Sequence, residues 1–450
     1  MAFVARLFGT DGVRGLANDE LTAELAIDLS VAAAHVLADL GLFAGHRPVA
    51  IVGRDTRASG EFLEAAVVSG LASAGVDVRR VGVIPTPGVA FLVDEEGADF
   101  GVVLSASHNP MPDNGIKFFA RGGSKLDDAL EDAIEARLGE SWTRPTGAQI
   151  GRIVEDKDGY NAYLNHLVAS IPNRLEGLSV VVDCANGAAS VISPEALRRA
   201  GASVTAISAE PTGLNINDDC GTTHMAGLQA KVRALGADLG IAHDGDADRC
   251  FAVDAEGNIV DGDAILAILA ISMKETGKLV GNTVVATVMS NMGFHIAMAK
   301  EDIQVITTGV GDRYLLEAMR EQGLNLGGEQ SGHIIISDYA GTGDGVLTAL
   351  HLMSRMQSSG QTLSQLASVV TALPQVLVNV PDVDKTRLDQ CHPVTMVVKS
   401  VEAELGAHGR VLLRPSGTEP LIRVMVEART IDLAQSSAAR IAQAVQEHLS

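Results

Sequence analysis

The stretch PVAIV at residues 48–52 begins the pattern that decides the fold. It is a short apolar run typical of a buried strand, and it leads through Arg54–Arg57 into GEFLEAAVVSGLASA at residues 60–74, whose apolar spacing predicts a helix. The run VDVRRVGV at residues 76–83 then predicts a second strand. Strand, helix and strand in this order form a βαβ unit, which predicts a sheet with helices packed against it.

The same alternation of short apolar strands and amphipathic helices returns twice along the chain. The second set consists of strands at 179–183, 203–207 and 238–242, with helices at 194–200 and 226–235. The third set consists of strands at 283–288, 303–307 and 324–326, with helices at 293–299 and 313–322. Three related α/β units are therefore expected to follow one another.

After Pro374 the pattern changes to that of a smaller domain. The expected elements are strands at 375–380, 410–413 and 421–426 and a closing helix at 432–449. The sequence thus predicts an α/β protein with three consecutive related α/β domains of mixed or parallel sheets with helices, and a smaller C-terminal α+β domain. Clusters of polar residues, Gly and Pro place these domains at 1–155, 156–254, 255–372 and 373–450.

The chain of 450 residues is longer than a single hydrophobic core usually supports, which agrees with several domains. Hydrophobic residues make up 46% of it, but no apolar run approaches the ~18 to 20 residues of a membrane span. The first residues lack the features of a secretory signal. The four cysteines lie far apart without a Cys-x-x-Cys spacing, which indicates neither a zinc site nor a disulfide framework. We therefore expect a soluble, cytoplasmic protein with no membrane partner.

The formal net charge of −22 disfavours a nucleic-acid partner, because the phosphate backbone binds to positive surfaces. Aromatic residues are only 3% of the chain, which also disfavours surfaces that stack on bases. An acidic chain weakly repels anions in general. A phosphorylated small molecule would therefore need a locally basic cleft.

The stretch SASHNP at residues 105–110 follows the apolar run 100–104, a predicted buried strand. Ser107 would lie just past the carboxyl end of that strand, where open α/β sheets usually hold ligands. A serine hydroxyl becomes reactive through an adjacent base or an attached phosphoryl group, and His108 and Lys117 are nearby basic groups. A polar turn ended by the Asn-Pro pair explains the same residues, so this stretch alone leaves both interpretations open.

Three carboxylates at alternate positions, Asp244, Asp246 and Asp248, follow the last strand of the second unit. An extended loop can turn them to one side, where they offer the hard oxygen ligands that Mg²⁺ prefers. An EF-hand calcium loop is excluded, because the positions that require Gly and Glu hold Arg249 and Ala255. An aspartyl-phosphatase site, with Asp244 as the nucleophile and Asp246 as its acid/base partner, stays chemically open.

The stretch GGEQSGH at residues 327–333 follows a predicted strand of the third unit. Its Glu329, Ser331 and His333 could bind sugar hydroxyls, and its glycines would allow a close backbone approach. A glycine-rich turn in which His333 packs against the next apolar run is the alternative.

The stretch RPSGTEP at residues 414–420 lies between two predicted strands. Arg414, two hydroxyls and a glycine-opened backbone form the donor set of a phosphate cradle, to which Arg423 adds a second cation. A Walker-type phosphate loop occurs nowhere in the sequence. A plain tight turn is the alternative, but it would not require two arginines.

A glycine-rich stretch, FGTDGVRG at residues 8–15, lies near the start of the chain. Its Arg14 could reach a phosphorylated Ser107, although a structural turn accounts for the stretch equally well. Together, five motifs resemble those of the α-D-phosphohexomutases, in the same order and over essentially the whole chain. These motifs are residues 8–15, 105–110, 244–249, 328–333 and 414–420.

The resemblance implies four domains around a central cleft, with one principal motif from each. It implies that Ser107 is phosphorylated in the active enzyme, and that one Mg²⁺ per active site is held by the Ser107 phosphate, Asp244, Asp246 and Asp248. The other implied residues of the reacting centre are Arg14, Arg249 and the two acid/base candidates, His108 and the preferred Lys117. The implied sugar-binding residues are Glu329, Ser331 and His333. The implied ligands of the non-transferring phosphate are Arg414, Ser416, Gly417, Thr418 and Arg423.

Two motifs resemble those of the branch of this family that acts on glucosamine phosphates, namely residues 9–15 and 328–333. The implied reaction interconverts glucosamine 6-phosphate and glucosamine 1-phosphate through a phosphoserine and a 1,6-bisphosphate, in UDP-N-acetylglucosamine biosynthesis. A hexose 1,6-bisphosphate is the implied activator. A phosphomannomutase/phosphoglucomutase is the alternative, and a Mg²⁺-dependent sugar phosphatase is a more distant one.

One segment departs from the family pattern. Residues 306–314 keep the family's Val-Gly-Asp-Arg-Tyr but lack the arginine expected shortly before it, which leaves open some contacts of the third domain. The sequence does not determine the oligomeric state, and a homodimer is compatible with it.

Overall fold

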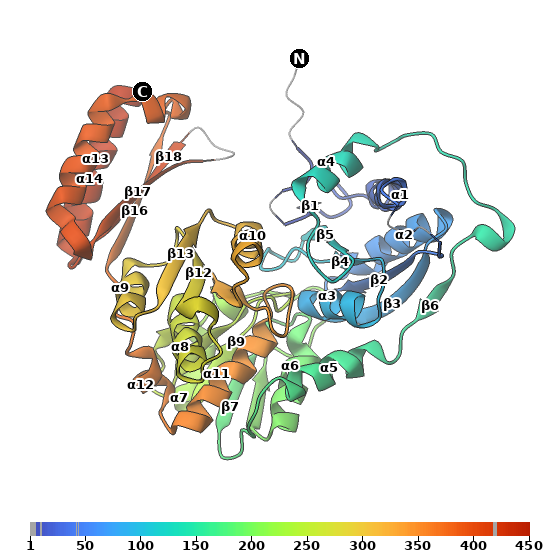
Figure 1. Ribbon diagram of the computed structural model, residues 1–450, viewed down its shortest axis with the longest axis horizontal. Coiled ribbons are helices and arrows are strands. Elements are labelled where there is room, and N and C mark those ends of the chain that lie inside the picture. Colours follow the sequence, from blue (N-terminus) through green and yellow to red (C-terminus); the bar gives the residue numbers. More distant parts are fainter. Residues whose placement is uncertain (1–5, 10, 42, 44, 417–420) are drawn as a thin grey trace. The chain divides into compact units, whose positions relative to one another are not determined.

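The computed structural model describes residues 6–9, 11–41, 43, 45–416 and 421–450. The chain divides into two compact units (Figure 1). The first extends to Met289 and also includes Ile303–Ser368, and the second consists of Ser290–Asp302 and Val369–Ser450. The first unit contains three sheets and the second contains one, among the described residues.

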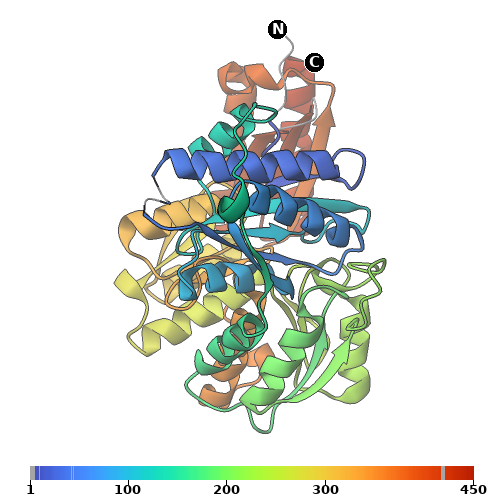
Figure 2. The ribbon, with the colours of Figure 1, turned by 90° about the vertical axis from the view of Figure 1, so that its right-hand side faces the viewer.

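The first sheet has the strand order β1-β5-β4-β2-β3-β6. Its strands are β1 (Val13–Leu16), β2 (Val49–Arg54), β3 (Asp77–Val83), β4 (Phe100–Leu104), β5 (Asp113–Ala120) and β6 (Ile153–Glu155). Strands β2, β3, β4 and β6 are parallel, whereas β5 is antiparallel to both β1 and β4, so the sheet is mixed. The associated helices are α1 (Ala23–Asp39), α2 (Ser59–Ser73), α3 (Thr86–Glu95) and α4 (Asp128–Ala136). Helices α1 and α2, in blue, lie side by side in Figure 2 and bury Leu29 and Leu63 completely.

The second sheet has the order β11-β10-β9-β7-β8, with β7, β8 and β9 parallel and β10 and β11 antiparallel to their neighbours. Its strands are β7 (Ser179–Asp183), β8 (Ser203–Ile207), β9 (Leu239–Ala242), β10 (Phe251–Asp254) and β11 (Ile259–Val260). Its helices are α5 (Gly159–Ala169), α6 (Ala189–Ala200) and α7 (Ala226–Leu235). Helix α6 begins at Ala189, before the expected residue 194, and therefore contains Pro194 in its interior.

The third sheet has the order β13-β12-β14-β15. Its strands are β12 (Thr283–Thr287), β13 (Gln304–Thr308), β14 (Leu326–Gly328) and β15 (Ile334–Ile336). The helices of this part of the first unit are α8 (Gly262–Glu275), α10 (Asp312–Gln322), α11 (Gly345–Ser359) and α12 (Leu363–Ala367). Helix α11 begins at its cap Asp344, whose carboxylate accepts a hydrogen bond from the Leu347 amide.

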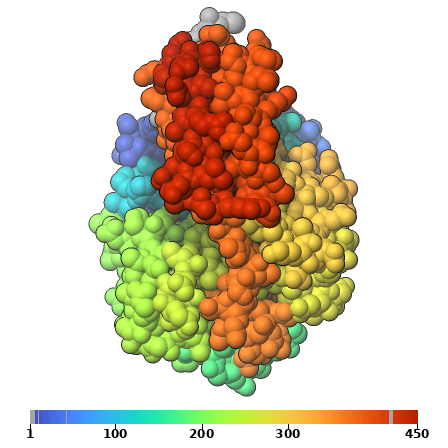
Figure 3. Space-filling view, turned by 90° about the vertical axis from the view of Figure 1, so that its left-hand side faces the viewer, coloured from blue at the N-terminus to red at the C-terminus, as the bar shows by residue number. Residues whose placement is uncertain are grey.

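The second unit is built on an antiparallel sheet of order β16-β18-β17. Its elements are α9 (Met292–Lys300), β16 (Gln375–Pro381), α13 (His392–Leu405), β17 (Arg410–Pro415), β18 (Leu421–Glu427) and α14 (Ile431–Leu449). Helices α13 and α14 pack against each other, and their orange and dark red surfaces lie side by side in Figure 3. Helix α9 packs with this unit, where the Met292 amide donates to Glu427 Oε2 at 2.7 Å.

Short 3₁₀ helices complete the described structure. They are Gly147–Gln149, Gly221–Thr223, Val280–Asn282, Lys385–Gln390 and Gly406–His408. No helix of the described residues is both long enough and apolar enough to cross a membrane. For the site, the important feature is that the loops after β4, β9 and β14 all begin at the carboxyl ends of strands.

Candidate active site

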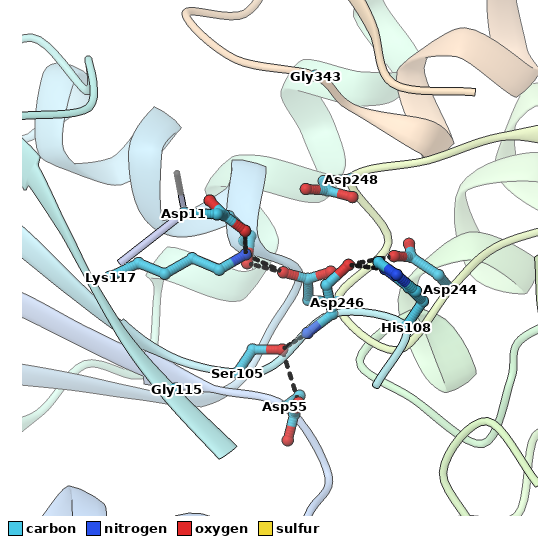
Figure 4. Close-up of polar contacts among 12 residues, drawn as sticks. Asp11, Asp55, Ser105, His108, Gly115, Lys117, Asp244, Asp246, Asp248 and Gly343 are labelled. Atoms are coloured by element: carbon cyan, nitrogen blue, oxygen red, sulfur yellow. Dashed lines mark hydrogen bonds and ion pairs between the residues drawn. The ribbon is translucent and has the colours of Figure 1, made fainter. Parts of the chain in front are cut away.

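Three loops of the first unit meet at one point. Ser107, after β4, donates a hydrogen bond from Oγ to Asp244 Oδ2, after β9, at 2.6 Å. The loop after β9 in turn pairs with the loop after β14, because the Cys250 amide donates to the Gly332 carbonyl at 3.0 Å. Segments far apart in the sequence therefore form a single polar centre (Figure 4).

Ser107 has an unusual backbone conformation for a residue other than glycine. Its φ is +52°, and its side chain is 1% exposed. Its Oγ lies 3.3 Å from His108 Nδ1. Burial, and then the positive charges of Arg249 and Arg14, lower the pKa of His108 to about 4. The imidazole next to the serine hydroxyl is therefore uncharged at neutral pH.

Asp244, Asp246 and Asp248, which we call the carboxylate triad, are all buried. They can present one oxygen each within 4.8 Å of one another, and they are the one such group with metal-binding potential that the described residues contain. One oxygen of each carboxylate is buried without a hydrogen-bond partner. Buried carboxylate oxygens need a compensating partner, and three hard oxygens this close together suit a divalent cation. The triad therefore fits the Mg²⁺ that the sequence predicts.

The charges within the triad act on one another. Burial, and then the negative charges of Asp248 and Asp246, raise the pKa of Asp244 to about 7. Burial also opposes ionisation of Asp248, but a hydrogen bond and positive charge from His333 outweigh it and lower the pKa of Asp248. Crowding of this kind is relieved by a bound cation.

His333 faces the triad instead of open space. Its side chain is 4% exposed, with Nδ1 3.5 Å from Asp248 Oδ2 and Nε2 3.2 Å from the Gly343 amide. Burial lowers the pKa of His333, but Asp248 and then Asp312 raise it, to about 9. With its pKa raised this far, the ring is an imidazolium at neutral pH, and it pairs with Asp248 through Nδ1 and with Asp312 Oδ2, 3.6 Å away, through Nε2.

Lys117, on β5, joins the triad to a chain of buried and partly buried ion pairs. Its Nζ lies 2.8 Å from both Asp246 Oδ2 and Asp11 Oδ2 (Figure 4). Asp11 also binds Lys125, whose Nζ is 2.5 Å from Asp312 Oδ2. Burial lowers the pKa of Lys117, but Asp11 and Asp246 more than offset it and raise the pKa overall. Lys117 is therefore an ammonium group in this arrangement.

Two arginines approach the triad. Arg249 Nε lies 3.8 Å from carboxylate oxygens of both Asp244 and Asp248. Arg14, on β1, pairs with Asp11. Both arginines, together with His108, line a cavity of about 200 Å³. The wall of the space beside the triad therefore includes two guanidinium groups.

Glu329 and Ser331 line a neighbouring cavity of about 520 Å³, which also has Arg249 in its wall. Glu329 is held by the Gly311 amide, which donates to its Oε1 at 3.1 Å. Ser331 Oγ donates to the other oxygen of Glu329 at 3.3 Å. A carboxylate and a hydroxyl fixed in this way can bind the hydroxyl groups of a small polar ligand.

The predicted phosphate cradle lies in the second unit. Arg414 on β17 and Arg423 on β18, which we call the arginine pair, are directly opposed in the antiparallel register. Ser416 is buried, and its carbonyl accepts a hydrogen bond from Lys385 Nζ at 2.5 Å. The predicted ligands Gly417 and Thr418 lie outside the described residues.

Sequence reasoning missed several charged neighbours of the site. Asp11 lies inside a motif from which only Arg14 was chosen, and Asp312 lies inside the Val-Gly-Asp-Arg-Tyr segment. Lys125 and Lys385 have no local signal in the sequence, because their partners are far away along the chain. Thr86 was also missed, and its Oγ1 donates to Asp246 Oδ2 at 2.7 Å.

Comparison with known proteins shows the family of the chain. Models of the phosphoglucomutase/phosphomannomutase family match residues 5–143 (alpha/beta/alpha domain I), 158–257 (domain II), 261–373 (domain III) and 376–444 (C-terminal domain). The phosphoglucosamine mutase of Streptomyces griseus subsp. griseus is 62% identical over 451 residues, covering 99% of this chain and 100% of that protein.

Solved structures share the fold. A phosphoglucomutase/phosphomannomutase family protein from Burkholderia thailandensis has a TM-score of 0.80 at 23% identity, covering 98% of this chain and 97% of the other. An N-acetylphosphoglucosamine mutase from Aspergillus fumigatus, in complex with GlcNAc-6P and magnesium, has a TM-score of 0.70 at 18% identity, covering 99% and 96%.

The chain therefore belongs to the phosphoglucomutase/phosphomannomutase family, a class of phosphohexomutases. Its identity to the Streptomyces protein over the full length places it with the phosphoglucosamine mutases of that family. The predicted family resemblance and the predicted class, three α/β domains followed by a smaller C-terminal domain, are confirmed.

Proposed function

We propose that this protein interconverts glucosamine 6-phosphate and glucosamine 1-phosphate, with Ser107 as the carrier of the transferred phosphoryl group. The observation that carries this proposal is the 2.6 Å hydrogen bond from Ser107 Oγ to Asp244, within a triad in which each carboxylate has one buried oxygen without a hydrogen-bond partner. The phosphoglucosamine mutase relative supports the choice of sugar. The product would feed the synthesis of UDP-N-acetylglucosamine.

The carboxylate triad would hold one Mg²⁺ together with an oxygen of the Ser107 phosphate. The magnesium in the Aspergillus complex supports the choice of ion for this family. A bound Mg²⁺ supplies positive charge that stabilises a transferring phosphoryl group. His333 would keep Asp248 in place, and Thr86 and Lys117 would keep Asp246 in place.

In the forward transfer, a hydroxyl of the sugar attacks the phosphorus of phosphorylated Ser107. The bond between phosphorus and Ser107 Oγ breaks, a bond between phosphorus and the sugar oxygen forms, and the proton of the attacking hydroxyl passes to a base. His108 and Lys117 are the candidates for proton transfer, the first uncharged and the second an ammonium group. Arg14 and Arg249 would balance the charge of the phosphoryl group.

The resulting 1,6-bisphosphate would reorient and return its other phosphoryl group to Ser107. Glu329 and Ser331 would bind sugar hydroxyls during both half-reactions. The arginine pair and Ser416, with Gly417 and Thr418, would bind the phosphate that is not transferred. A hexose 1,6-bisphosphate would restore the phosphoserine when it is lost.

The test compares catalytic efficiency on glucosamine 1-phosphate, glucose 1-phosphate and mannose 1-phosphate after charging with glucose 1,6-bisphosphate. We expect the amino sugar to be preferred and the mass of the Ser107 peptide to increase by one acid-stable phosphate. A preference for glucose 1-phosphate or mannose 1-phosphate would show that the protein is a mutase of neutral sugars instead. Release of inorganic phosphate without phosphoserine would indicate a phosphatase instead.

A further inference from the structure

A fully buried arginine lies beneath the Ser107 loop. Arg57 is 0% exposed and follows β2, the strand next to β4 in the first sheet. All five of its side-chain N–H groups have acceptors. These acceptors are Asp55 Oδ2 (3.0 Å) and the carbonyl oxygens of Ser107 (3.0 Å), Asn109 (2.8 Å), Pro110 and Asp113 (3.0 Å). One guanidinium thus binds four carbonyls of the loop that carries the reactive serine.

The same loop is held from the second sheet. Asn217 Nδ2 donates to the carbonyls of Ser107 at 2.8 Å and Asn109 at 3.0 Å, so it shares both acceptors with Arg57. Asn217 is itself fixed, because its amide donates to the Ala185 carbonyl at 2.9 Å, next to the end of β7. Two α/β domains therefore bind the same two backbone oxygens.

The amide of Ser107 is fixed as well. It donates to Ser105 Oγ at 2.9 Å, and Ser105 Oγ donates to Asp55 Oδ2 at 2.6 Å. Asp55 accepts from Arg57 through both its backbone amide and its Nε. Both polar backbone groups of Ser107 are thus held at φ +52°, a conformation that serine rarely adopts without such support.

We propose that Arg57 and Asn217 are positioning residues that clamp the Ser107 loop and thereby aim the serine oxygen at the carboxylate triad. The proposal rests on the proposed function only in taking Ser107 as the phosphoryl carrier. Because one member of the clamp comes from each of two domains, the productive position of Ser107 depends on their docking. Neither residue touches the triad through its own side chain in the described structure.

Lysine cannot replace Arg57 in this role. A guanidinium presents five N–H donors in a flat, rigid fork, whereas an ammonium group presents three donors at one point. Arg57→Lys therefore keeps the charge but releases part of the loop. A shift of about 1 Å in a reacting group lowers the rate by about 100-fold, so we expect that loss in kcat with KM changed by less than about 3-fold. Asn217→Ala removes two hydrogen bonds and should lower kcat by about 10-fold.

The experiment compares wild type, R57K and N217A with the matched control Arg54→Lys. Arg54 lies on β2, is partly buried, and pairs with Glu64 instead of the loop. Three properties are measured: kcat and KM on the preferred sugar phosphate, the fraction of Ser107 that glucose 1,6-bisphosphate phosphorylates, and the Ser107 φ in crystal structures. We expect R57K to phosphorylate slowly and to show Ser107 released from φ near +52°, while R54K behaves like wild type.

A kcat of R57K within 3-fold of R54K, together with an unchanged Ser107 φ, would overturn the clamp. If R57K does not fold, N217A decides: a folded N217A with wild-type kcat overturns the proposal, and a 10-fold fall with unchanged KM supports it. A wild-type enzyme that is inactive on every sugar phosphate would refute the proposed function alone, because the Ser107 φ of R57K still tests the clamp.

Discussion

The carboxylate triad of the first unit and the arginine pair of the second unit both bring like charges together, but the two groups differ in burial and therefore in their expected roles. The triad is buried, and each of its residues has one oxygen without a hydrogen-bond partner. In the arginine pair, Arg423 is exposed and Arg414 is half-buried, at the surface of a hairpin. Buried like charges depend strongly on a bound counter-ion, whereas exposed ones are screened by water. The triad should therefore control chemistry and stability, and the arginine pair should control affinity.

Ser107→Ala should have the largest effect, and it tests whether the chemical step takes place at the serine next to the triad. Without the oxygen that carries the phosphoryl group, kcat should fall by at least about 10⁴-fold. Mg²⁺ binding, measured by titration calorimetry, should persist because the triad is intact. The control is Ser203→Ala, an exposed serine on β8. Appreciable turnover by the Ser107 variant would remove the serine from the mechanism.

Arg414→Ala tests whether the arginine pair controls the affinity for the substrate. Loss of a charge-assisted hydrogen bond to a phosphate costs about 1.5–3 kcal/mol, so KM should rise by roughly 10- to 100-fold with a smaller change in kcat. Arg440→Ala is the matched control in the same unit, since Arg440 forms an exposed ion pair with Glu404 and should have little effect. A fall in kcat at constant KM would show that this unit contributes to the chemical step.

The local parts of both sites could be predicted from the sequence, because each motif directly follows or interrupts a short apolar strand. The boundaries of β7 and α7 agree with the expected ranges, since the apolar pattern and flanking turn residues define them locally. The start of α6 was wrong, because Pro194 suggested a helix start and lies inside the helix. Strands β1 and β6 were not predicted, since such short edge strands carry little pattern of their own.

The connections between motifs could not be predicted. Lys125 bridges Asp11 and Asp312, which lie 301 residues apart in the chain, and only the docking of the domains brings them together. The expected role of His333 in sugar binding stays a prediction, although the ring faces Asp248. Composition and spacing specify which chemistry is present, whereas charge pairing requires the tertiary structure.

Asp244→Asn tests whether the triad destabilises the metal-free protein. The pKa of Asp244 is raised from its ordinary value of 3.8 to about 7, so the folded state binds this proton more tightly than the unfolded state does. The contribution of Asp244 to stability therefore falls as pH rises from about 4 to about 7, and the penalty is fully present above that range. The variant should raise the melting temperature in EDTA by more at pH 8 than at pH 5.

At pH 8, excess Mg²⁺ should instead give wild type a higher melting temperature than Asp244→Asn. The reason is that Mg²⁺ binding stabilises the protein with the intact triad more than the variant. Asp219→Asn is the control, since this carboxylate is exposed, lies outside the triad and has His224 4.0 Å away. Differential scanning calorimetry from pH 5 to pH 8 measures both effects. A pH-independent difference between wild type and Asp244→Asn would show that the triad carboxylates do not oppose one another.

Lys385→Met should have the smallest effect. It compares a residue that supports the cradle through the backbone with Arg414, a proposed ligand of the phosphate. Lys385 Nζ donates to the backbone carbonyl of Ser416, so it supports the shape of the cradle loop through the backbone. Loss of one such hydrogen bond costs about 1 kcal/mol, so KM should rise by about 5-fold while kcat stays unchanged. Lys399→Met, on the exposed side of α13, is the control and should leave both constants unchanged. If Lys385→Met instead raises KM as much as Arg414→Ala does, Lys385 must bind the phosphate itself, and the cradle has three cationic ligands instead of two.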